Sequence, residues 1–160
     1  MSMFSAFNIN ASGLTAQRYR MDIISENVAN ANTTRTADGT PYRRKTLVFA
    51  ERGERADFSH VQHHIDFSHV LNRAIYNSQE YTGKGVRVNG VYEDYETEMN
   101  MVYDPSHPDA DENGYVTYPN VNIITEMTNM IDASRAYEAN ATAFNASKSM
   151  ALQGLEIGRG

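Results

Sequence analysis

Proline is confined to the middle of the chain, and this constrains the fold more than any other feature of the sequence. The four prolines are Pro41, Pro105, Pro108 and Pro119. Because proline breaks the interior of a helix, the two proline-free ends can each form a long helix. We therefore predict a core helix within residues 1–33, a β-rich outer region over 34–118 with an insertion at about 54–79, and a second core helix within 119–160.

The N-terminal segment carries an apolar repeat of seven residues. A repeat of this length keeps one seam on one side of a supercoiled helix, which predicts a helix over residues 3–32. Arg18 and Ser25 interrupt the stripe, and Asn30 and Asn32 are suited to end the helix because Asn tolerates the left-handed conformation. The repeat consists of Phe7, Leu14, Met21 and Val28, with Phe4, Ala11, Ile24 and Ala31 at the intermediate positions.

The C-terminal segment has a similar stripe, with Pro119 and Asn120 as the expected start, Asn120 as the cap, and Gly158 near the end. A row of small residues from Ala136 to Ala146 follows another face and is compatible either with further helix packing or with a solvated surface. The stripe consists of Ile123, Met127, Met130, Ser134, Tyr137, Ala141, Phe144, Lys148, Ala151 and Leu155. Pairing the two ends would bury both stripes, and each large side chain buried contributes about 1.5–3 kcal/mol.

The predicted fold class is α+β, in which long N- and C-terminal helices pair as a coiled coil and the middle forms a small β-rich domain. Residues 46–49 and the stretch "MNMVYD", residues 99–104, have β-favouring sequences. Around Asn89-Gly90, alternating valines indicate either a hairpin or one strand with a bulge at Gly90. The sequence "DPSHPDADENGY" is typical of a turn-rich loop.

Two groups of residues suggest metal chemistry, and each has a simpler interpretation. The pairing of His60 with His64 would place two imidazoles on one face of a helix, so the alternative function is a metal-binding enzyme or sensor. We favour an amphipathic surface insertion there. The cluster consists of His60, His63, His64 and His69.

The second group is "DADENG", which matches the opening of a calcium loop. Asn120 occupies the twelfth position, where such a loop requires a bidentate glutamate. We therefore favour a loop of Asx turns over a calcium site between Asp109 and Asn113.

Composition excludes several other functions. The net charge of −6 disfavours nucleic-acid binding, and the chain has no cysteine. We expect neither a cleaved signal peptide nor direct insertion into a membrane.

The short basic run Arg43 to Lys45 suggests salt bridges with an acidic surface such as "YEDYETE" on a neighbour. No catalytic constellation emerges, so we expect no enzymatic activity and no cofactor.

Both ends of the chain carry recognisable motifs. The segment "SGLTAQRYRMDIISENVANANTT", marked by Gly13-Leu14, Asn27 and Ala29-Asn30, resembles the N-terminal motif of flagellar rod, hook and hook-associated axial proteins. The segment "YPNVNIITEMTNMIDASRAYEANATAFNASKSMALQGLEIG" resembles the flagellar basal-body rod protein family, and most closely its proximal-rod subunits. Residues from Glu54 to Gln79 depart from the pattern, and we expect that insertion to contact neighbouring rod subunits or a surrounding ring.

The resemblance implies a structural subunit that polymerises helically to form an axial drive shaft and export channel in the periplasm. Its partners would be itself, other rod subunits and the flagellar type III export apparatus. Asn27 and Asn30 would contribute contacts between subunits. The residues assigned to helix packing and assembly are Phe7, Leu14, Met21, Asn27, Val28, Asn30, Met127, Met130, Tyr137, Phe144 and Leu155.

Overall fold

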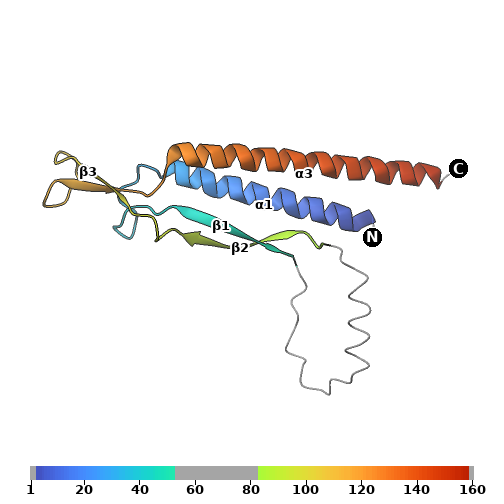
Figure 1. Cartoon of the computed structure of the whole chain (residues 1–160), viewed down its shortest axis with the longest axis horizontal. Coiled ribbons are helices and arrows are strands. Elements are labelled where there is room, and N and C mark those ends of the chain that lie inside the picture. Colours follow the sequence, from blue (N-terminus) through green and yellow to red (C-terminus); the bar gives the residue numbers. More distant parts are fainter. Residues whose placement is uncertain (1–2, 53–82, 159–160) are drawn as a thin grey trace, which may run out of the picture.

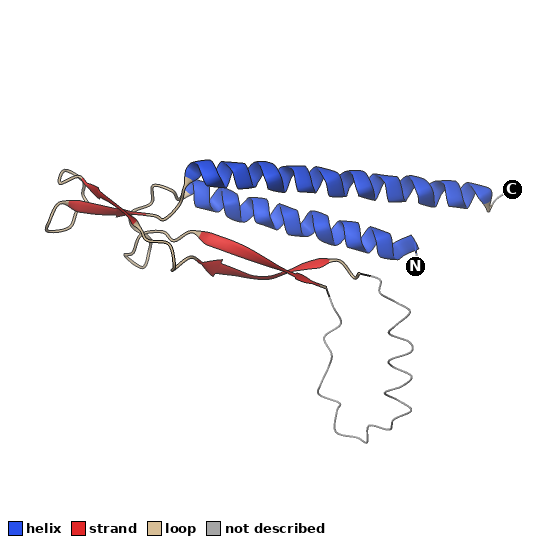
Figure 2. Ribbon diagram, viewed as in Figure 1, coloured by secondary structure: helices blue, strands red, loops and turns tan. Residues whose placement is uncertain are grey.

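Two long helices lie side by side; one small β-ribbon runs alongside them, and a second extends beyond one end of the helix pair (Figure 1). The computed structural model describes residues 3–52 and 83–158. The helices are α1, Met3–Ala29, and α3, Ile123–Ile157; the strands are β1, Lys45–Glu51, β2, Val86–Glu93, β3, Asn100–Tyr103, and β4, Tyr115–Tyr118. Figure 2 shows the helices at one end and the β3–β4 hairpin at the other. This confirms two long terminal helices around a small β-containing middle.

The helix ends are set by local hydrogen bonds. α1 ends at Ala29, and the Asn30 side chain donates from Nδ2 to the Glu26 carbonyl at 2.9 Å. α3 is capped by Asn122, whose Oδ1 accepts from the backbone N–H of Ile124 at 3.0 Å and of Thr125 at 3.2 Å. The prediction that Asn120 caps this helix was wrong, because Asn120 is buried in a different network described below. Gly158 caps the C-terminal end, as expected.

The two helices pack closely and antiparallel. The rings of Phe7 and Phe144 meet edge to face with centroids 5.2 Å apart, and Asn10 donates to Ser147 at 3.3 Å. The Asn140 amide approaches the Gly13 backbone so closely that a methyl group added at Gly13 would lie 2.9 Å from Oδ1 of Asn140 and would displace this side chain.

The face that α3 presents to α1 differs in part from the predicted stripe. Its buried residues are Glu126, Ala133 and Ser147, while Met127 and Lys148 are exposed. Met130, Phe144 and Ala151 are half-buried. Five of the ten predicted stripe positions are half-buried and five are exposed. At two of the exposed positions, Met127 and Lys148, the preceding residue is the buried one. The reason is the close spacing of the helices, which favours small and hydrogen-bonding side chains in the seam over large apolar ones.

The opposite face of α1 covers the β1–β2 ribbon, so that α1 lies between α3 and this ribbon (Figure 1). Ser12, Ala16, Ile23 and Asn27 follow this face and are buried. Their spacing of three to four residues is that of one side of a helix. The buried residues of α1 therefore contact two elements, α3 and the β1–β2 ribbon. A coiled-coil seam alone predicts contact with the other helix only.

The β1–β2 ribbon is antiparallel and contains a bulge. Val48 lies opposite Gly90, whereas Phe49 lies opposite Val88, so Asn89 is the extra residue. Of the two alternatives at Asn89-Gly90, the single strand with a bulge is therefore confirmed. β3 pairs with β4 in a separate antiparallel hairpin, and the connection between them is the expected turn-rich loop.

Gly85 fixes the start of β2 against α1. Its φ of +95° is one that residues with a side chain rarely adopt, and an added Cβ would lie 2.2 Å from Oγ of Ser12. That hydroxyl donates to the Ile9 carbonyl at 2.7 Å and accepts from the Val86 N–H at 3.0 Å. The close approach of the two backbones thus depends on glycine.

Substitution of Gly85 by alanine should lower the free energy of unfolding by more than about 1–2 kcal/mol, the cost of the left-handed backbone alone. The contact with Ser12 adds to this cost. Gly83→Ala is the matched control, because an added Cβ at Gly83 meets no atom within 4 Å. Urea denaturation followed by circular dichroism measures both variants. Equal stability of the two would contradict this account of the ribbon.

Within the described residues, no helix is long and apolar enough to cross a membrane. The histidine cluster from His60 to His69, and the insertion that contains it, lie outside the described residues. The predictions made for them therefore remain predictions.

Candidate functional site

A network of polar side chains lies where α1 ends, β1 begins and α3 begins, and we call it the polar junction. Asn27 is its centre and has only 1% of its surface exposed. Its Oδ1 accepts from the Tyr42 hydroxyl and from the Lys45 N–H, both at 2.9 Å. Its Nδ2 donates to the Lys45 carbonyl at 2.9 Å and to Oε2 of Glu126 at 3.0 Å. An asparagine amide has two donors and two acceptor sites, so Asn27 uses its whole hydrogen-bonding capacity inside the chain.

Glu126 contributes a carboxylate from the first turn of α3 and is also 1% exposed. Its Oε1 accepts from Nε and Nη2 of Arg44 at 3.0 and 2.8 Å, and from Asn129 at 3.3 Å. Burying a carboxylate is costly unless it is paired and hydrogen-bonded. Arg44 and Asn27 satisfy this requirement, and the N-terminal end of a helix also favours a negative charge.

Tyr42 lies in the segment before β1 and joins the polar junction through its hydroxyl, which donates to Asn27. It is buried, and burial raises the pKa of its phenol well above the ordinary value of 10.0, with the negative charges of Glu26, Glu126 and Glu93 adding to the effect. The fold therefore favours the neutral phenol, which is the form that donates to Asn27. Lys45 approaches the Tyr42 ring at 5.6 Å and pairs with Glu26.

The raised pKa predicts a loss of stability in alkali. Below the ordinary pKa of 10.0 the phenol is protonated in both the folded and unfolded states, so its contribution is complete. As the pH rises above that value the unfolded state ionises first, and the contribution declines. At pH 8 Tyr42→Phe should therefore cost about 0.5–1.5 kcal/mol, the usual net value of one hydrogen bond.

The measurement is urea denaturation of the parent and the Tyr42→Phe variant between pH 8 and pH 11, and we expect the difference between them to shrink above about pH 10. Tyr19→Phe, at an exposed position on α1, controls for titration of the other tyrosines. A difference that stays constant over this range would refute the assigned cause.

Asn120 connects the junction to the second half of the β-region. Its Oδ1 accepts from the Arg44 N–H at 2.9 Å, and its Nδ2 donates to the carbonyls of Asp94 and Thr97 at 3.0 and 3.2 Å. The Asp94 carboxylate accepts from the Thr97 N–H, which is the main cause of its lowered pKa. This buried amide holds the segment after β2 to the segment before α3.

The basic run Arg43 to Lys45 pairs within the chain. Besides its bonds to Glu126, Arg44 approaches Asp94 at 3.8 Å, and the Arg43 guanidinium lies 4.4 Å from the centre of the Tyr95 ring. The acidic segment "YEDYETE" does supply partners, but they belong to the same chain. The pairing of this run with a neighbour's acidic surface remains a prediction.

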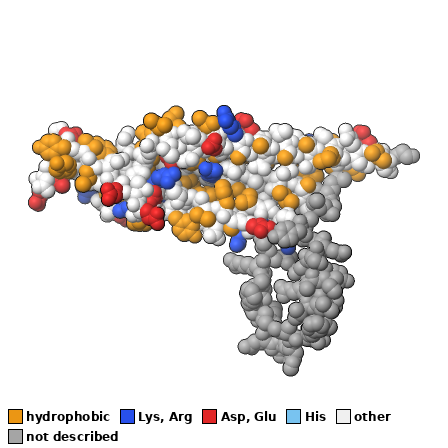
Figure 3. Space-filling model, in the orientation of Figure 1, with side chains coloured by type: hydrophobic (Ala, Val, Ile, Leu, Met, Phe, Trp, Pro, Cys, Tyr) orange, Lys and Arg blue, Asp and Glu red, His pale blue; other side chains and the backbone are white. Residues whose placement is uncertain are grey.

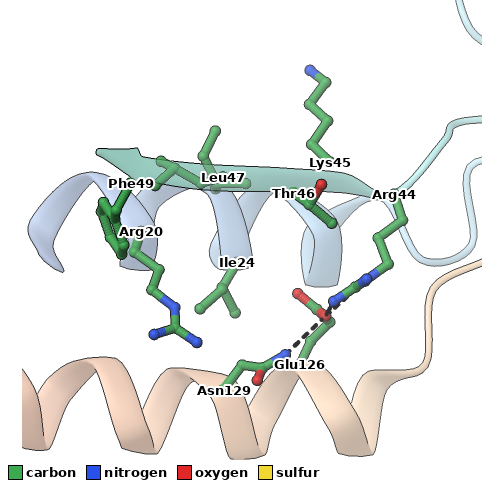
Figure 4. Close-up of a pocket in the computed structure, with 10 residues that line it drawn as sticks. Arg20, Ile24, Arg44, Lys45, Thr46, Leu47, Phe49, Glu126 and Asn129 are labelled. Atoms are coloured by element: carbon green, nitrogen blue, oxygen red, sulfur yellow. Dashed lines mark hydrogen bonds and ion pairs between the residues drawn. The ribbon is translucent and has the colours of Figure 1, made fainter. Parts of the chain in front are cut away.

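A groove of about 330 Å³ opens beside the polar junction, between α1, β1 and α3. Figure 4 shows Arg20 extending from α1 toward α3, while Arg44 points at Glu126. Ile24, Leu47 and Phe49 supply apolar walls. Arg44, Lys45 and Glu126 are held by hydrogen bonds and ion pairs, so the site is suited to fixing three elements relative to one another.

The residues assigned to packing and assembly fall into three environments. Asn27 is buried with its polar atoms satisfied inside the chain, so the structure does not support its assignment to a contact between subunits. Exposed on α3 are Met127, Tyr137 and Leu155. Half-buried are Phe7, Leu14, Met21, Val28, Asn30, Met130 and Phe144.

The candidate calcium loop has its carboxylates engaged elsewhere. Asp109 accepts from the Thr34 hydroxyl at 2.7 Å and lies 3.9 Å from Arg35. Oδ1 of Asp111 accepts from the N–H groups of Asn113 and Tyr115 at 2.9 and 2.8 Å, which confirms an Asx turn there. Among residues 3–52 and 83–158, no three His, Cys, Asp or Glu side chains gather in a group that could hold a metal ion.

Sequence reasoning missed Glu126 and Ser12, and it gave Asn120 the role of a helix cap. A usable pattern existed for the first of these, since Glu126, Ala133, Asn140 and Ser147 are spaced by seven, like the apolar stripe beside them. These residues are small or hydrogen-bonding, and a search for apolar repeats passes over them.

Comparison with known proteins gives similarity along the whole chain. Residues 7–35 match a family model described as flagella basal body rod protein, and residues 112–157 match one described as flagellar basal body rod FlgEFG protein C-terminal. The flagellar basal-body rod protein FlgC of Bacillus subtilis is 42% identical, covering 99% of this chain and 100% of the relative. The protein of the same name from Borreliella burgdorferi is 43% identical over 100% of both chains. The one from Salmonella typhimurium is 36% identical, covering 99% of this chain and 100% of the relative.

Proposed function

The chain belongs to the family of flagellar basal-body rod proteins named FlgC, and from this premise we propose that it is a structural subunit of the proximal rod. It polymerises helically through its terminal helices and so contributes to the drive shaft and its export channel. Its role is mechanical and not catalytic.

The outer face of α3 supports polymerisation through the helices. Ile124, Met127 and Ile131 follow one side of the helix at spacings of three and four residues, and Ile124 and Met127 are 78% and 58% exposed. A helix that leaves such a stripe in water gains about 1.5–3 kcal/mol for each large side chain that a partner buries. Packing against further helices, including coiled-coil packing, is the simplest use of this face.

The polar junction supports a role in transmitting torque. Through Asn27, Arg44 and Glu126 the helix pair and the β1–β2 ribbon are joined by buried, directional bonds. A subunit with such a joint turns as one unit when its helices are driven. In this proposal the helices form the inner core of the tube, and the β-region lies outside.

The proposed location is the periplasmic part of the basal body, reached through the flagellar type III export apparatus without cleavage of a signal peptide. The proposed partners are other rod subunits, further copies of this chain and the export apparatus.

Deletion of the gene in its own bacterium tests the function. We expect cells that lack rods and do not swim in soft agar, and basal bodies that regain the rod when the intact chain is supplied. Cryo-electron microscopy of isolated basal bodies then locates the tagged chain. Cells that assemble normal rods without it would overturn the proposal.

A further inference from the structure

The outer edge of β1 has backbone groups that β2 does not use. In an antiparallel pair, successive residues direct their N–H and C=O groups alternately toward the partner strand and away from it. Arg44 and Arg52, which flank β1, each form a backbone hydrogen bond of 2.8 Å to the residue opposite on the β2 side, so the even-numbered residues of β1 face β2. Lys45 faces the other way, because both of its backbone groups bond to the Asn27 amide.

Leu47 and Phe49 continue this outer edge. The bulge lies in β2, so the alternation along β1 is unbroken, and the N–H and C=O groups of both residues point away from β2. Within residues 3–52 and 83–158 these groups form no hydrogen bond. Unpaired groups on the edge of a strand are a template for pairing with another extended chain.

This edge borders the groove beside the polar junction. Four residues of β1 and none of β2 line the groove, and α1 contributes Ile23 and Ile24. Every Cα of β1 lies more than 8 Å from every Cα of α3, so α3 does not cover the edge. Figure 3 shows hydrophobic side chains gathered between the helix pair and the β1–β2 ribbon. A segment lying along the edge would therefore meet apolar side chains as well as free backbone groups.

Arg20 supplies an unpaired positive charge in this groove. Its side chain extends from α1 toward α3 (Figure 4), and it forms no ion pair with any residue that the structure describes. The residues three and four positions away on α1, where a pairing carboxylate would lie, are all uncharged. The other two cations of the groove, Arg44 and Lys45, already pair with Glu126 and Glu26. A chain that covers Arg20 must therefore bring a carboxylate, because burying an unpaired charge is costly.

We propose that the outer edge of β1 and Arg20 together form a docking site for an extended acidic segment of a partner protein. The segment adds as a third strand, pairs its backbone with Leu47 and Phe49, and places one carboxylate on Arg20. In this mode of recognition the main-chain hydrogen bonds supply affinity and the side-chain contacts supply specificity. The site belongs to the single chain, so the inference goes beyond the proposed function and holds whether or not the chain polymerises.

Peptides selected from a random display library on the immobilised full-length chain supply the probes. We expect the enriched peptides to carry an aspartate or glutamate, and fluorescence anisotropy measures the affinity of the tightest one. Arg20→Met should weaken it about fivefold, as expected for an ion pair near the surface. Arg18→Met, at an exposed position on the same helix, should leave it unchanged. A library that yields no binder, or a peptide that binds Arg20→Met as tightly as the parent, would overturn the proposal.

A second pair of variants tests the backbone pairing. Leu47→Pro removes the edge N–H without removing a bond to β2, and Leu47→Ala shortens the side chain while keeping that N–H. We expect the peptide to bind the proline variant about fivefold more weakly than the alanine variant. If Leu47→Pro does not fold, hydrogen exchange of the parent decides. The N–H groups of Leu47 and Phe49 should exchange at least about tenfold more slowly with saturating peptide, and unchanged exchange would refute strand addition.

Cross-linking in the chain's own bacterium identifies the occupant. The photoreactive p-benzoylphenylalanine is incorporated in place of Phe49, and mass spectrometry locates the cross-linked segment. We expect an acidic segment of a different protein, and we expect the cross-link to disappear when Arg20→Met is added. The absence of any cross-link, cross-links only to a second copy or only within the chain, or a cross-link that persists without Arg20 would each contradict the proposal.

Discussion

Replacement of Arg44 by methionine should lower the free energy of unfolding by about 3–5 kcal/mol, the usual cost of removing one partner of a buried ion pair. The Glu126 carboxylate is 1% exposed in the parent chain, and the variant removes the two N–H donors that lie 3.0 and 2.8 Å from it. Methionine retains much of the aliphatic length of arginine, so the loss reports mainly on charge and hydrogen bonding. Urea denaturation followed by circular dichroism measures it.

Two further variants separate the buried pair from the basic run as a whole. Arg43→Met removes the neighbouring charge, which stacks on an exposed tyrosine, and should cost about 1 kcal/mol or less. Arg44→Met/Glu126→Leu removes both charges of the pair and should recover a large part of the stability, because no carboxylate is then left buried. If Arg44→Met is as stable as Arg43→Met, Glu126 is not held as described.

Asn27→Ala should cost about 3 kcal/mol or more, since each buried group left without a partner costs about 1–3 kcal/mol. The groups affected are the Tyr42 hydroxyl, both backbone polar groups of Lys45 and Oε2 of Glu126. Denaturation of the purified chain is the primary measurement, and rod formation in cells is the secondary one. We expect the loss of assembly to follow the loss of folding.

Asn30→Ala is the matched control for this substitution. Asn30 is half-buried, donates to the Glu26 carbonyl and accepts from the Thr33 hydroxyl, so its loss should cost about 1 kcal/mol. If the Asn27→Ala chain keeps the parent's stability but fails to assemble, the result would support a role for Asn27 in contacts between subunits.

The sequence predicted the helices well because their determinants are local. Proline position, the apolar repeat and Gly158 are readable within one segment, and α1 and α3 begin and end within a few residues of the expected positions. The bulge at Asn89-Gly90 was one of two alternatives because the choice depends on the pairing with β1, a strand about forty residues earlier.

The polar junction was not predictable in the same way. Asn27 was singled out, but as a residue for capping or for contacts between subunits, because a sequence does not reveal which distant groups surround a side chain. Its partners Tyr42 and Glu126 come from two other parts of the chain. Met127 was preferred over Glu126 for the helix seam on hydrophobicity alone. The buried glutamate becomes favourable only when Arg44 is placed beside it.

The ends of the β1–β2 ribbon have a consequence for how such a protein can change over evolution and be modified in the laboratory. The Arg52 N–H donates to the Gly85 carbonyl at 2.8 Å. The chain therefore leaves the β1–β2 ribbon and re-enters it at two adjacent residues. Extending a loop whose ends are already held together costs little, since each doubling of its length adds only about 0.6 kcal/mol. The segment between Arg52 and Gly85 is therefore a position where the chain can be lengthened or shortened, or a reporter domain inserted, without changing how α1 and α3 pack.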